Sequence, residues 1–339
     1  MVFRMMNTLL LSASEAGRAA EIIRVGGLVA IPTETVYGLG ASGLNEDAVR
    51  RIFEVKGRPQ DNPLILHVDS AEALAKWCVD IPETAYRLAD RFWPGPLTMV
   101  LPKAPCVPLR VTAGLDTVAM RCPDHPATRA LLRLAGVPVA APSANLSGKP
   151  STTTAQHCVH DLWGRVDAIL DGGPCRVGVE STILDLTVWP PRILRPGGVT
   201  QEQLAAVLGR VEVDPGLVRP DQTPKAPGMK YRHYSPQAEV RLLQGAPQRI
   251  YDYVNRLPDE GTAVLCFQGE EGRFPGKRVL AYGREDAPET LAAGVFACLR
   301  ALDTPEVKLI AARCPPEGGV GFAVINRLKK AAGGTILCL

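Results

Sequence analysis

The stretch LVAIPTETVYGLGASGLNEDAVRRIFEVKGRPQDNPLILHV at 28–68 determines the fold class of the chain. It begins with a short apolar run typical of a buried strand and ends with a second one at 64–68. Between the two runs, Asn45 is a typical helix N-cap, and the acidic residues that follow it suit the positive end of a helix. Pro59 disfavours helical geometry at the residue before it, so the helix is expected to end there. A strand, a helix and a strand in this order predict an α/β fold.

The same alternation continues on both sides of this stretch. A helix is expected at 15–25, where Gly26 and Gly27 end the apolar stripe. Further strands are predicted at LTMVL (97–101), VAMRC (118–122), VPVAA (137–141), AILDG (168–172) and STILDL (181–186). The pattern indicates a mixed α/β domain that extends to about residue 211.

Residues 212–237 have a different composition. Five prolines, at 215, 220, 224, 227 and 236, fall in a segment with little periodic apolar content, as is typical of a linker or an extended functional loop. Beyond it, apolar runs at 240–244, 262–267, 278–282 and 308–312 alternate with helical patterns at 247–257, 288–302 and 321–332. Residues 238–339 are therefore predicted to form a second, smaller α/β domain with a largely parallel sheet.

Charge and cysteine content limit the classes of partner and location. The net charge is +3, and residues 238–339 carry 13 basic against 12 acidic side chains, so neither domain is a basic module that wraps nucleic acid. Nine cysteines include no CxxC pair, and their odd number does not suggest a disulfide framework, which favours a reducing cytoplasm. No apolar run approaches the ~20 residues that span a bilayer, so no membrane partner is expected.

Five loop segments combine small or hydroxyl residues with isolated cations. They are PTETVYGLG (32–40), KGRPQDNP (56–63), APSANLSGKPS (141–151), GVEST (178–182) and LRPGG (194–198). Taken alone, the first segment favours a capped turn, and a capped turn also explains the third. The positive charges of Lys56 and Arg58 also suit a helix C-terminus. Neither SGKPS nor the later GGVGF fits a P-loop or a dinucleotide fingerprint. Together, the five segments predict a shared cleft for a polyanion and a small polar molecule.

In their order along the chain, these motifs closely resemble the YrdC/Sua5 family of threonylcarbamoyl-AMP synthases. The segment APGMKYRHYSP at 226–236 and the α/β tail resemble the long, Sua5-type subgroup, although Ala226 stands where a serine is expected. The resemblance implies a YrdC-like catalytic domain at 1–211 with a twisted mixed sheet and helices. A linker or lid loop at 212–237 would join it to a smaller, Rossmann-like Sua5-type domain at 238–339.

The resemblance also implies a nucleotidyltransferase reaction. L-threonine, bicarbonate and ATP would give L-threonylcarbamoyladenylate and pyrophosphate, and a separate tRNA threonylcarbamoyltransferase would use the product at adenosine 37 of tRNAs that read ANN codons. The threonine amine is itself a nucleophile, so the enzyme needs no nucleophilic serine or cysteine. The resulting carbamate must approach the α-phosphate, and fixed cations and Mg²⁺ reduce the repulsion between these anions. The Mg²⁺ is expected to be held mainly by the ATP phosphates.

Carried over motif by motif, the resemblance implies two neighbouring binding sites. The residues implied for L-threonine are Thr35, His67, Arg121, Ala141 and Ser181. Those implied for ATP are Arg58, Asn62, Thr117, Ser143, Asn145, Ser151, Arg195 and Tyr234. The implied catalytic cations are Lys56, Arg58 and Arg121. We interpret His67 as a partly buried hydrogen-bonding residue rather than a general base.

Alternatives remain open for the linker and for the function. Residues 225–234 combine basic and aromatic side chains without an acid, so the segment fits a solvated tether or a nucleic-acid patch. The resemblance favours a lid that places Tyr234 on the nucleotide and keeps water from the labile mixed anhydride. The cleft also fits carbamoyl transfer from carbamoyl phosphate, and the basic linker fits a non-enzymatic RNA-binding protein; direct contact with tRNA is left open.

Overall fold

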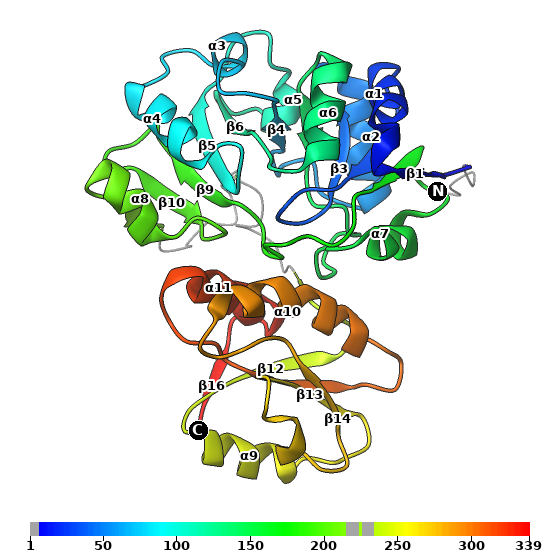
Figure 1. Ribbon diagram of the computed structural model, residues 1–339, viewed down its shortest axis with the longest axis vertical. Coiled ribbons are helices and arrows are strands. Elements are labelled where there is room, and N and C mark those ends of the chain that lie inside the picture. Colours follow the sequence, from blue (N-terminus) through cyan, green and yellow to red (C-terminus); the bar gives the residue numbers. More distant parts are fainter. Residues whose placement is uncertain (1–6, 215–223, 226–233) are drawn as a thin grey trace. The chain divides into compact units, whose positions relative to one another are not determined.

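The computed structural model describes residues 7–214, 224–225 and 234–339, and these form two compact units (Figure 1). Unit 1 comprises Met1–Ser147, Thr152–Arg176 and Glu180–Lys230, and unit 2 comprises Gly148–Ser151, Val177–Val179 and Tyr231–Leu339. Both units combine helices with a sheet, which confirms the predicted fold class. The domain boundaries at 211 and 238 stay predictions. Most of the predicted lid, at 226–233, lies outside the described residues.

Unit 1 is built on a mixed sheet. Within the described residues its eleven strands follow the order β1-β8-β2-β3-β7-β4-β6-β5-β9-β10-β11. The strands are β1 (Leu9–Ser12), β2 (Val29–Ile31), β3 (Gly38–Ser42), β4 (Ile65–His67), β5 (Leu97–Pro102), β6 (Thr117–Arg121), β7 (Val139–Ala141), β8 (Ala168–Asp171), β9 (Thr182–Asp185), β10 (Arg192–Arg195) and β11 (Glu212–Val213). Strand β4 pairs parallel with β6 and antiparallel with β7, so the predicted mixed sheet is confirmed.

Helices bury both faces of this sheet. Their bounds are α1 (Ala16–Arg24, after the 3₁₀ turn Ala13–Glu15), α2 (Glu46–Lys56), α3 (Leu74–Trp77), α4 (Glu83–Phe92), α5 (Leu109–Thr112), α6 (Pro126–Ala135), α7 (Ala155–Leu162) and α8 (Gln201–Leu208). Val29 and Ile31 of β2 join α1 and α6 in one core, whereas Leu28 and Ala30 join α2, α4 and α7 in another. Successive side chains of a strand point to opposite faces, so the two cores lie on opposite sides of the sheet.

Local signals explain where the second helix begins and ends. The Asn45 side chain accepts a hydrogen bond from the Ala48 backbone N–H, which caps α2 as predicted. Gly57 follows the helix with φ of 61°, a left-handed conformation that favours glycine. The turn directs the chain into the KGRPQDNP loop and then into β4.

Strand register collects polar side chains at one edge of the unit 1 sheet. His67, at the end of β4, is in register with Arg121, at the end of β6. Strand β5 runs antiparallel to β6 and parallel to β9, so β5 and β9 begin at the edge where β4 and β6 end. Thr98 and Ser181 lie at these beginnings. The sheet thus brings together side chains from four strand ends.

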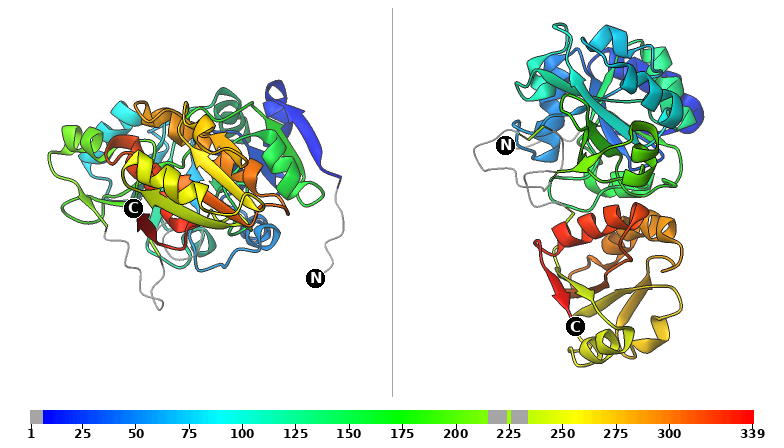
Figure 2. Two further views of the ribbon diagram at one scale, coloured as in Figure 1. Left: turned by 90° about the horizontal axis from the view of Figure 1, so that it is seen from below. Right: turned by 90° about the vertical axis from the view of Figure 1, so that its left-hand side faces the viewer.

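Unit 2 contains a parallel sheet. Among the described residues it has the order β14-β13-β15-β12-β16, and every pair is parallel. The elements are β12 (Glu239–Gln244), α9 (Pro247–Asn255), β13 (Thr262–Cys266), a 3₁₀ turn (Glu271–Arg273), β14 (Arg278–Ala281), α10 (Pro288–Leu302), β15 (Leu309–Arg313), α11 (Gly319–Ala331) and β16 (Ile336–Cys338). Helices α10 and α11 cover one face of the sheet and α9 the other (Figures 1 and 2). This arrangement confirms the Rossmann-like expectation.

Several strands have no clear signal in the sequence. Strand β3 has the sequence GLGAS and is buried throughout, but glycine, alanine and serine have little strand propensity. Strands β10, β11 and β16 were likewise not expected from the apolar pattern. In the described ranges of both units, no helix has the length and apolar content needed to cross a bilayer.

Gly197, in the loop after β10, allows a close approach of two backbone segments. A Cβ atom at this position would lie 2.2 Å from the Glu180 carbonyl oxygen and 2.4 Å from both the Ser181 carbonyl carbon and the Thr182 nitrogen. Any side chain here must displace the backbone that carries Ser181.

We predict that Gly197→Ala lowers the free energy of unfolding by about 1–3 kcal/mol, the usual cost of overpacking. Thermal unfolding followed by circular dichroism measures the change. Gly272→Ala is the matched control, because a Cβ atom at Gly272 meets nothing within 4 Å. An unchanged unfolding midpoint for Gly197→Ala would contradict the close approach.

Candidate active site

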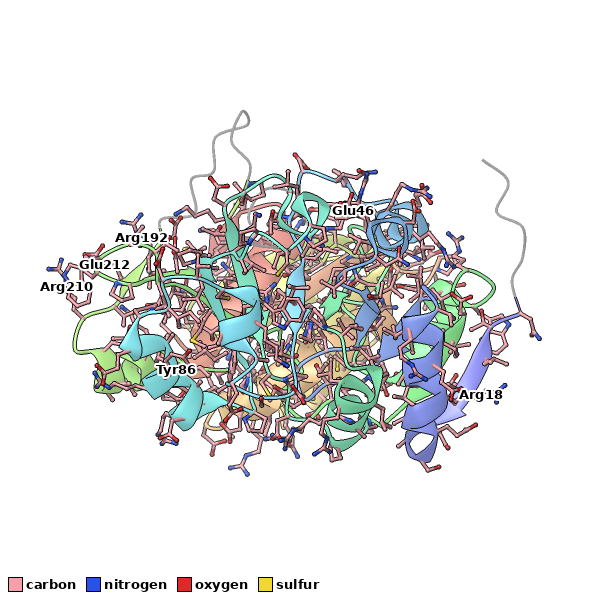
Figure 3. The ribbon with its side chains drawn as sticks, turned by 90° about the horizontal axis from the view of Figure 1, so that it is seen from above. Arg18, Glu46, Tyr86, Arg192, Arg210 and Glu212 are labelled. Carbon is pink, nitrogen blue, oxygen red and sulfur yellow. The ribbon has the colours of Figure 1, made fainter. Side chains whose placement is uncertain are left out.

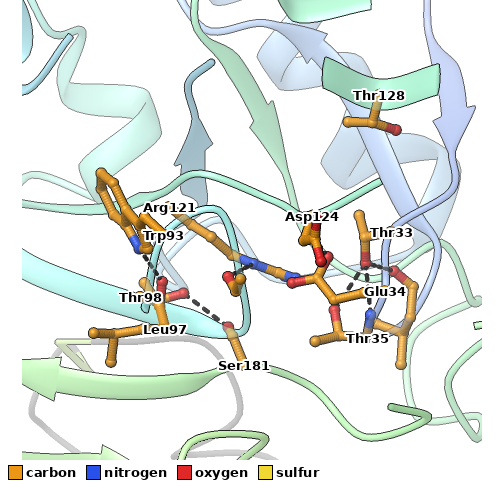
Figure 4. Close-up of polar contacts among 12 residues, drawn as sticks. Thr33, Glu34, Thr35, Trp93, Leu97, Thr98, Arg121, Asp124, Thr128 and Ser181 are labelled. Atoms are coloured by element: carbon orange, nitrogen blue, oxygen red, sulfur yellow. Dashed lines mark hydrogen bonds and ion pairs between the residues drawn. The ribbon is translucent and has the colours of Figure 1, made fainter. Parts of the chain in front are cut away.

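A buried ion pair lies at the centre of the polar edge of unit 1 (Figure 4). Nη2 of Arg121 lies 2.7 Å from Oε1 of Glu34, and only 5% and 1% of these side chains are exposed. Oε2 of Glu34 accepts a hydrogen bond from the backbone N–H of Asp124 at 2.9 Å, and Nε of Arg121 donates a long one to the Gly95 carbonyl at 3.4 Å. Together, these contacts hold the guanidinium in one orientation.

A chain of hydroxyl groups follows Glu34 in the 33–36 loop. Oγ1 of Thr33 lies 2.6 Å from the Val36 carbonyl oxygen and 2.8 Å from Oγ1 of Thr35. Because the carbonyl only accepts, the single hydroxyl proton of Thr33 goes to Val36, and Thr35 must donate to Thr33. The Thr35 oxygen is therefore placed to accept a hydrogen bond from an amine or hydroxyl group of a ligand.

Ser181 is held from two sides. Its Oγ lies 2.7 Å from Oγ1 of Thr98, and Nη2 of Arg195 donates to the same Oγ at 3.2 Å. Arg195 also donates to the Ser181 carbonyl, through Nε at 3.2 Å and Nη2 at 3.0 Å. Two residues predicted for different substrates, Ser181 for threonine and Arg195 for ATP, are thus in direct contact.

His67 is a neutral buried imidazole. It is 3% exposed, and burial together with the nearby positive charge of Arg121 lowers its pKa to about 3. Its Nδ1 is buried without a hydrogen-bond partner among the described residues. A neutral imidazole of this kind fits a hydrogen-bonding role, and that role stays a prediction.

The loop residues predicted for ATP surround the end of α2. The Lys56 ammonium donates to the carbonyl of Ser143 at 2.5 Å and to that of Asn145, so it ties the 143–145 segment to the helix. Arg58 donates to the carbonyl of Asn62 at 3.3 Å. The Asn62 amide is fully buried, and neither its nitrogen nor its oxygen has a partner among the described residues. A ligand amide or base edge would satisfy both atoms.

The predicted site residues fall into groups. Strand β7 ends at Ala141, which pairs with Ile65 two residues before His67. Thr117 lies at the other end of β6 from Arg121, about 13 Å away at the usual rise per strand residue. The structure therefore gathers His67, Arg121 and Ser181 at one edge, while Thr117 lies apart from them.

Two predicted ATP contacts belong to unit 2. Ser151 is fully buried, and its carbonyl accepts a hydrogen bond from Nε of Arg300 at 3.2 Å. The Tyr234 ring packs on the Phe296 ring with centroids 5.3 Å apart, and the Arg327 guanidinium lies 5.6 Å from its centre. These contacts attach the described end of the linker to unit 2, and the nucleotide contacts of Ser151 and Tyr234 stay predictions.

Another described part of the linker, which contains Lys225, contacts unit 1. Nζ of Lys225 lies 2.9 Å from Oδ2 of Asp185, a carboxylate at the end of β9 that is almost fully buried. Oδ1 of Asp185 accepts hydrogen bonds from the backbone N–H and the hydroxyl of Thr187. Both carboxylate oxygens are thus used, so Lys225 has a fixed partner.

Sequence reasoning did not assign Glu34 or Thr98 to the site. Glu34 is visible as a carboxylate in a loop of hydroxyl residues, and Thr98 as the one hydroxyl residue in the apolar run LTMVL. Their partners, Arg121 and Ser181, come from distant parts of the chain, so neither contact follows from local spacing.

Comparisons with known proteins place this site in a family. Residues 21–197 match the Sua5/YciO/YrdC family model, described as "Telomere recombination". Residues 199–333 match a model described as "Threonylcarbamoyl-AMP synthase, C-terminal domain". The chain belongs to the Sua5/YciO/YrdC family. The resemblance seen in its loop motifs is confirmed, including that to the long, Sua5-type subgroup.

Curated members of this family match along nearly the whole chain. A protein from Bacillus subtilis is 48% identical over 326 residues, which cover 95% of this chain and 94% of the relative. One from Pyrococcus abyssi is 49% identical and covers 94% of each. A Schizosaccharomyces pombe relative is 39% identical over 90% of this chain and 84% of its own. All three are named threonylcarbamoyl-AMP synthase.

Solved structures of family members share the fold. The crystal structure of P. abyssi Sua5 complexed with L-threonine superposes with a TM-score of 0.92 at 45% identity, covering 98% of this chain and 100% of that one. Escherichia coli YciO gives a TM-score of 0.51 at 27% identity and covers 57% of this chain and 96% of its own. The structural match to P. abyssi Sua5 thus extends over nearly all of the present chain.

The buried His67 makes stability depend on pH. Because its pKa of about 3 lies below the ordinary value of 6.5, the unfolded chain binds a proton between these pH values that the folded chain does not. Stability is therefore lost as pH falls below 6.5. Between pH 7 and pH 5, protonation of this residue in the unfolded chain should lower the free energy of unfolding by about 2 kcal/mol, at ~1.4 kcal/mol per pH unit.

We predict that lowering the pH from 7 to 5 reduces the free energy of unfolding of His67→Gln by about 2 kcal/mol less than that of the wild type. Urea unfolding at both pH values measures the difference. His160→Gln is the control, because 73% of the His160 side chain is exposed. The same pH dependence in wild type and His67→Gln would show that the pKa of His67 is not lowered in the folded protein.

Proposed function

We propose that the chain catalyses the formation of L-threonylcarbamoyladenylate and pyrophosphate from L-threonine, bicarbonate and ATP. The observation that carries this proposal is the fixed Arg121 guanidinium beside the Thr35 hydroxyl and the neutral His67, in a chain nearly half identical to named threonylcarbamoyl-AMP synthases. A buried cation suits a carboxylate, and nearby acceptors suit an amine. The P. abyssi relative crystallised with L-threonine supports an amino acid as the substrate.

In the first step, the threonine carboxylate pairs with Arg121, and its amine donates hydrogen bonds to Oγ1 of Thr35 and Nδ1 of His67. The unprotonated amine attacks the carbon of CO₂, which bicarbonate yields when it takes up a proton and loses water. A C–N bond forms, one C=O π bond opens onto its oxygen, and the amine releases a proton to solvent, which leaves a carbamate. The enzyme supplies no nucleophile. Burial raises the pKa of the Cys122 thiol to about 11 and also raises that of Cys175, so the buried thiols near this edge remain protonated and unreactive.

In the second step, the carbamate oxygen attacks the α-phosphate, and the bond from the α-phosphorus to the pyrophosphate oxygen breaks. Lys56, Arg58 and Arg195 supply fixed positive charge for the phosphates, and the Asn62 amide supplies a donor and an acceptor. The contact between Arg195 and Ser181 joins the nucleotide and threonine sides, which favours alignment of the reacting groups.

ATP brings Mg²⁺ into the site through its phosphates. Over the described ranges, no group of three or more histidine, cysteine, aspartate or glutamate residues is arranged to hold a metal ion. We expect the ATP phosphates to be the main ligands of Mg²⁺. When bound, Mg²⁺ neutralises charge on the pyrophosphate as it leaves. The product passes to a tRNA threonylcarbamoyltransferase, in the cytoplasm that the cysteine content favours.

Pyrophosphate release tests the reaction directly. With ATP and Mg²⁺ present, we expect release only when both L-threonine and bicarbonate are added. Pyrophosphate release that continues when L-threonine or bicarbonate is left out would contradict the proposal. Dependence on carbamoyl phosphate would instead favour carbamoyl transfer, and tight binding of structured RNA at physiological salt without turnover would favour an RNA-binding protein.

We predict that Arg58→Ala lowers kcat/KM for ATP at least 100-fold, because it removes a cation from the phosphate site. Arg18→Ala is the matched control. Arg18 lies on α1, and its side chain is 55% exposed (Figure 3). Circular dichroism at 222 nm checks that both variants are folded. Wild-type turnover in Arg58→Ala would show that Arg58 is not part of the ATP site.

A further inference from the structure

We propose that Glu34 is a positioning residue for amino-acid recognition: its carboxylate fixes Arg121 and Thr35 at the spacing of a substrate carboxylate and amine. This inference rests on the proposed function, because it assigns the carboxylate of L-threonine to Arg121. Glu34 itself touches no substrate.

The contacts of Glu34 exclude a role as the base. Oε1 accepts from Nη2 of Arg121 and Oε2 accepts from the Asp124 backbone N–H, so each oxygen already has a donor. The side chain is 1% exposed, and its charge is balanced by a guanidinium that is itself 5% exposed. Removing one partner of such a buried ion pair strongly destabilises the fold, because the other charge is left buried without compensation.

The guanidinium keeps donors for a ligand. With Nη2 on Glu34 and Nε directed to Gly95, the Nη1 group of Arg121 has no hydrogen-bond partner among the residues that the structure describes. Its two N–H groups are therefore available to a carboxylate. Figure 4 shows the Arg121 side chain between Ser181 and the Thr33–Thr35 loop.

Glu34 also connects two chain segments that approach the ligand from different sides. It belongs to the loop that carries Thr35, while Arg121 and Asp124 belong to the end of β6 and the turn that follows. The carboxylate of Asp124 pairs in turn with Arg176, which fixes this turn. Because one carbon separates the carboxylate and amine of an α-amino acid, their two recognition groups need a constant spacing, and Glu34 is the side chain that sets it.

Steady-state kinetics with L-threonine and ATP varied separately tests the proposal. In Glu34→Gln, one amide oxygen replaces two acceptors, so Arg121 or Asp124 loses its partner. We expect KM for L-threonine to rise 10- to 100-fold, KM for ATP to change less than threefold, and kcat to fall less than KM rises. Glu34→Asp keeps the charge but is one methylene shorter, and it should give an intermediate KM for L-threonine.

Glu46→Gln is the matched control. Glu46 lies in the first turn of α2, its side chain is 61% exposed, and its nearest cation is Arg110 at 3.8 Å (Figure 3). Both Michaelis constants should match the wild type. Calorimetric titration with L-threonine and with ATP, each alone, checks that the Glu34 variants lose affinity for the amino acid and not for the nucleotide.

Three results would overturn the proposal. One is an unchanged KM for L-threonine in both Glu34 variants. Another is an equal rise in both Michaelis constants, which would indicate a general structural role. The third is a loss of kcat with an altered pH–rate profile at unchanged KM, which would make Glu34 a base. If Glu34→Gln does not fold, Glu34→Asp and its titration decide. A wild-type protein without threonine-dependent pyrophosphate release would contradict the proposed function instead.

Discussion

The site depends on one constraint: a guanidinium and a carboxylate are buried together where β6 meets the 33–36 loop. Neither charge is tolerated there alone, since breaking a buried pair typically costs ~3–5 kcal/mol. The pair therefore fixes the loop against the end of β6. Register then places His67 beside Arg121, and the parallel pairing of β5 with β9 places Thr98 beside Ser181. The polar edge of the sheet is thus stabilised by the same contacts that shape it for a ligand.

The structure suits chemistry in which the substrates supply the reactive atoms. Ser181 shares its hydroxyl with Thr98 and Arg195, and burial raises the pKa values of the cysteine thiols around the site. Among the residues of the site that the structure describes, no group resembles an activated nucleophile. What the chain offers is alignment and fixed charge, and these are what an amine, a carbonate species and a nucleoside triphosphate need in order to react with one another.

Much of the fold could be predicted because its signals are local. The Asn45 cap and the apolar runs of β4, β5 and β6 each depend on neighbouring residues, and all appear where expected. Strand β3 was missed because its residues are small and buried on both faces. In the site, family resemblance supplied the motif residues, but Glu34 and Thr98 depend on contacts with Arg121 and Ser181, 87 and 83 positions away. Such pairs become visible only when the pairing of strands that are distant in the sequence is known.

The neutral His67 has a consequence for how the protein responds to its surroundings. With its pKa held near 3 and arginine charged throughout the physiological range, the His67 and Arg121 part of the site keeps the same charge across the pH values that a cell experiences. His67 and Arg121 then contribute no titration of their own to recognition. Changes in rate with pH would reflect the substrates, through the fraction of unprotonated amine and the balance of bicarbonate and CO₂. Under the proposed reaction, the pH dependence of the rate would therefore follow the protonation of dissolved carbonate and of the substrate amine.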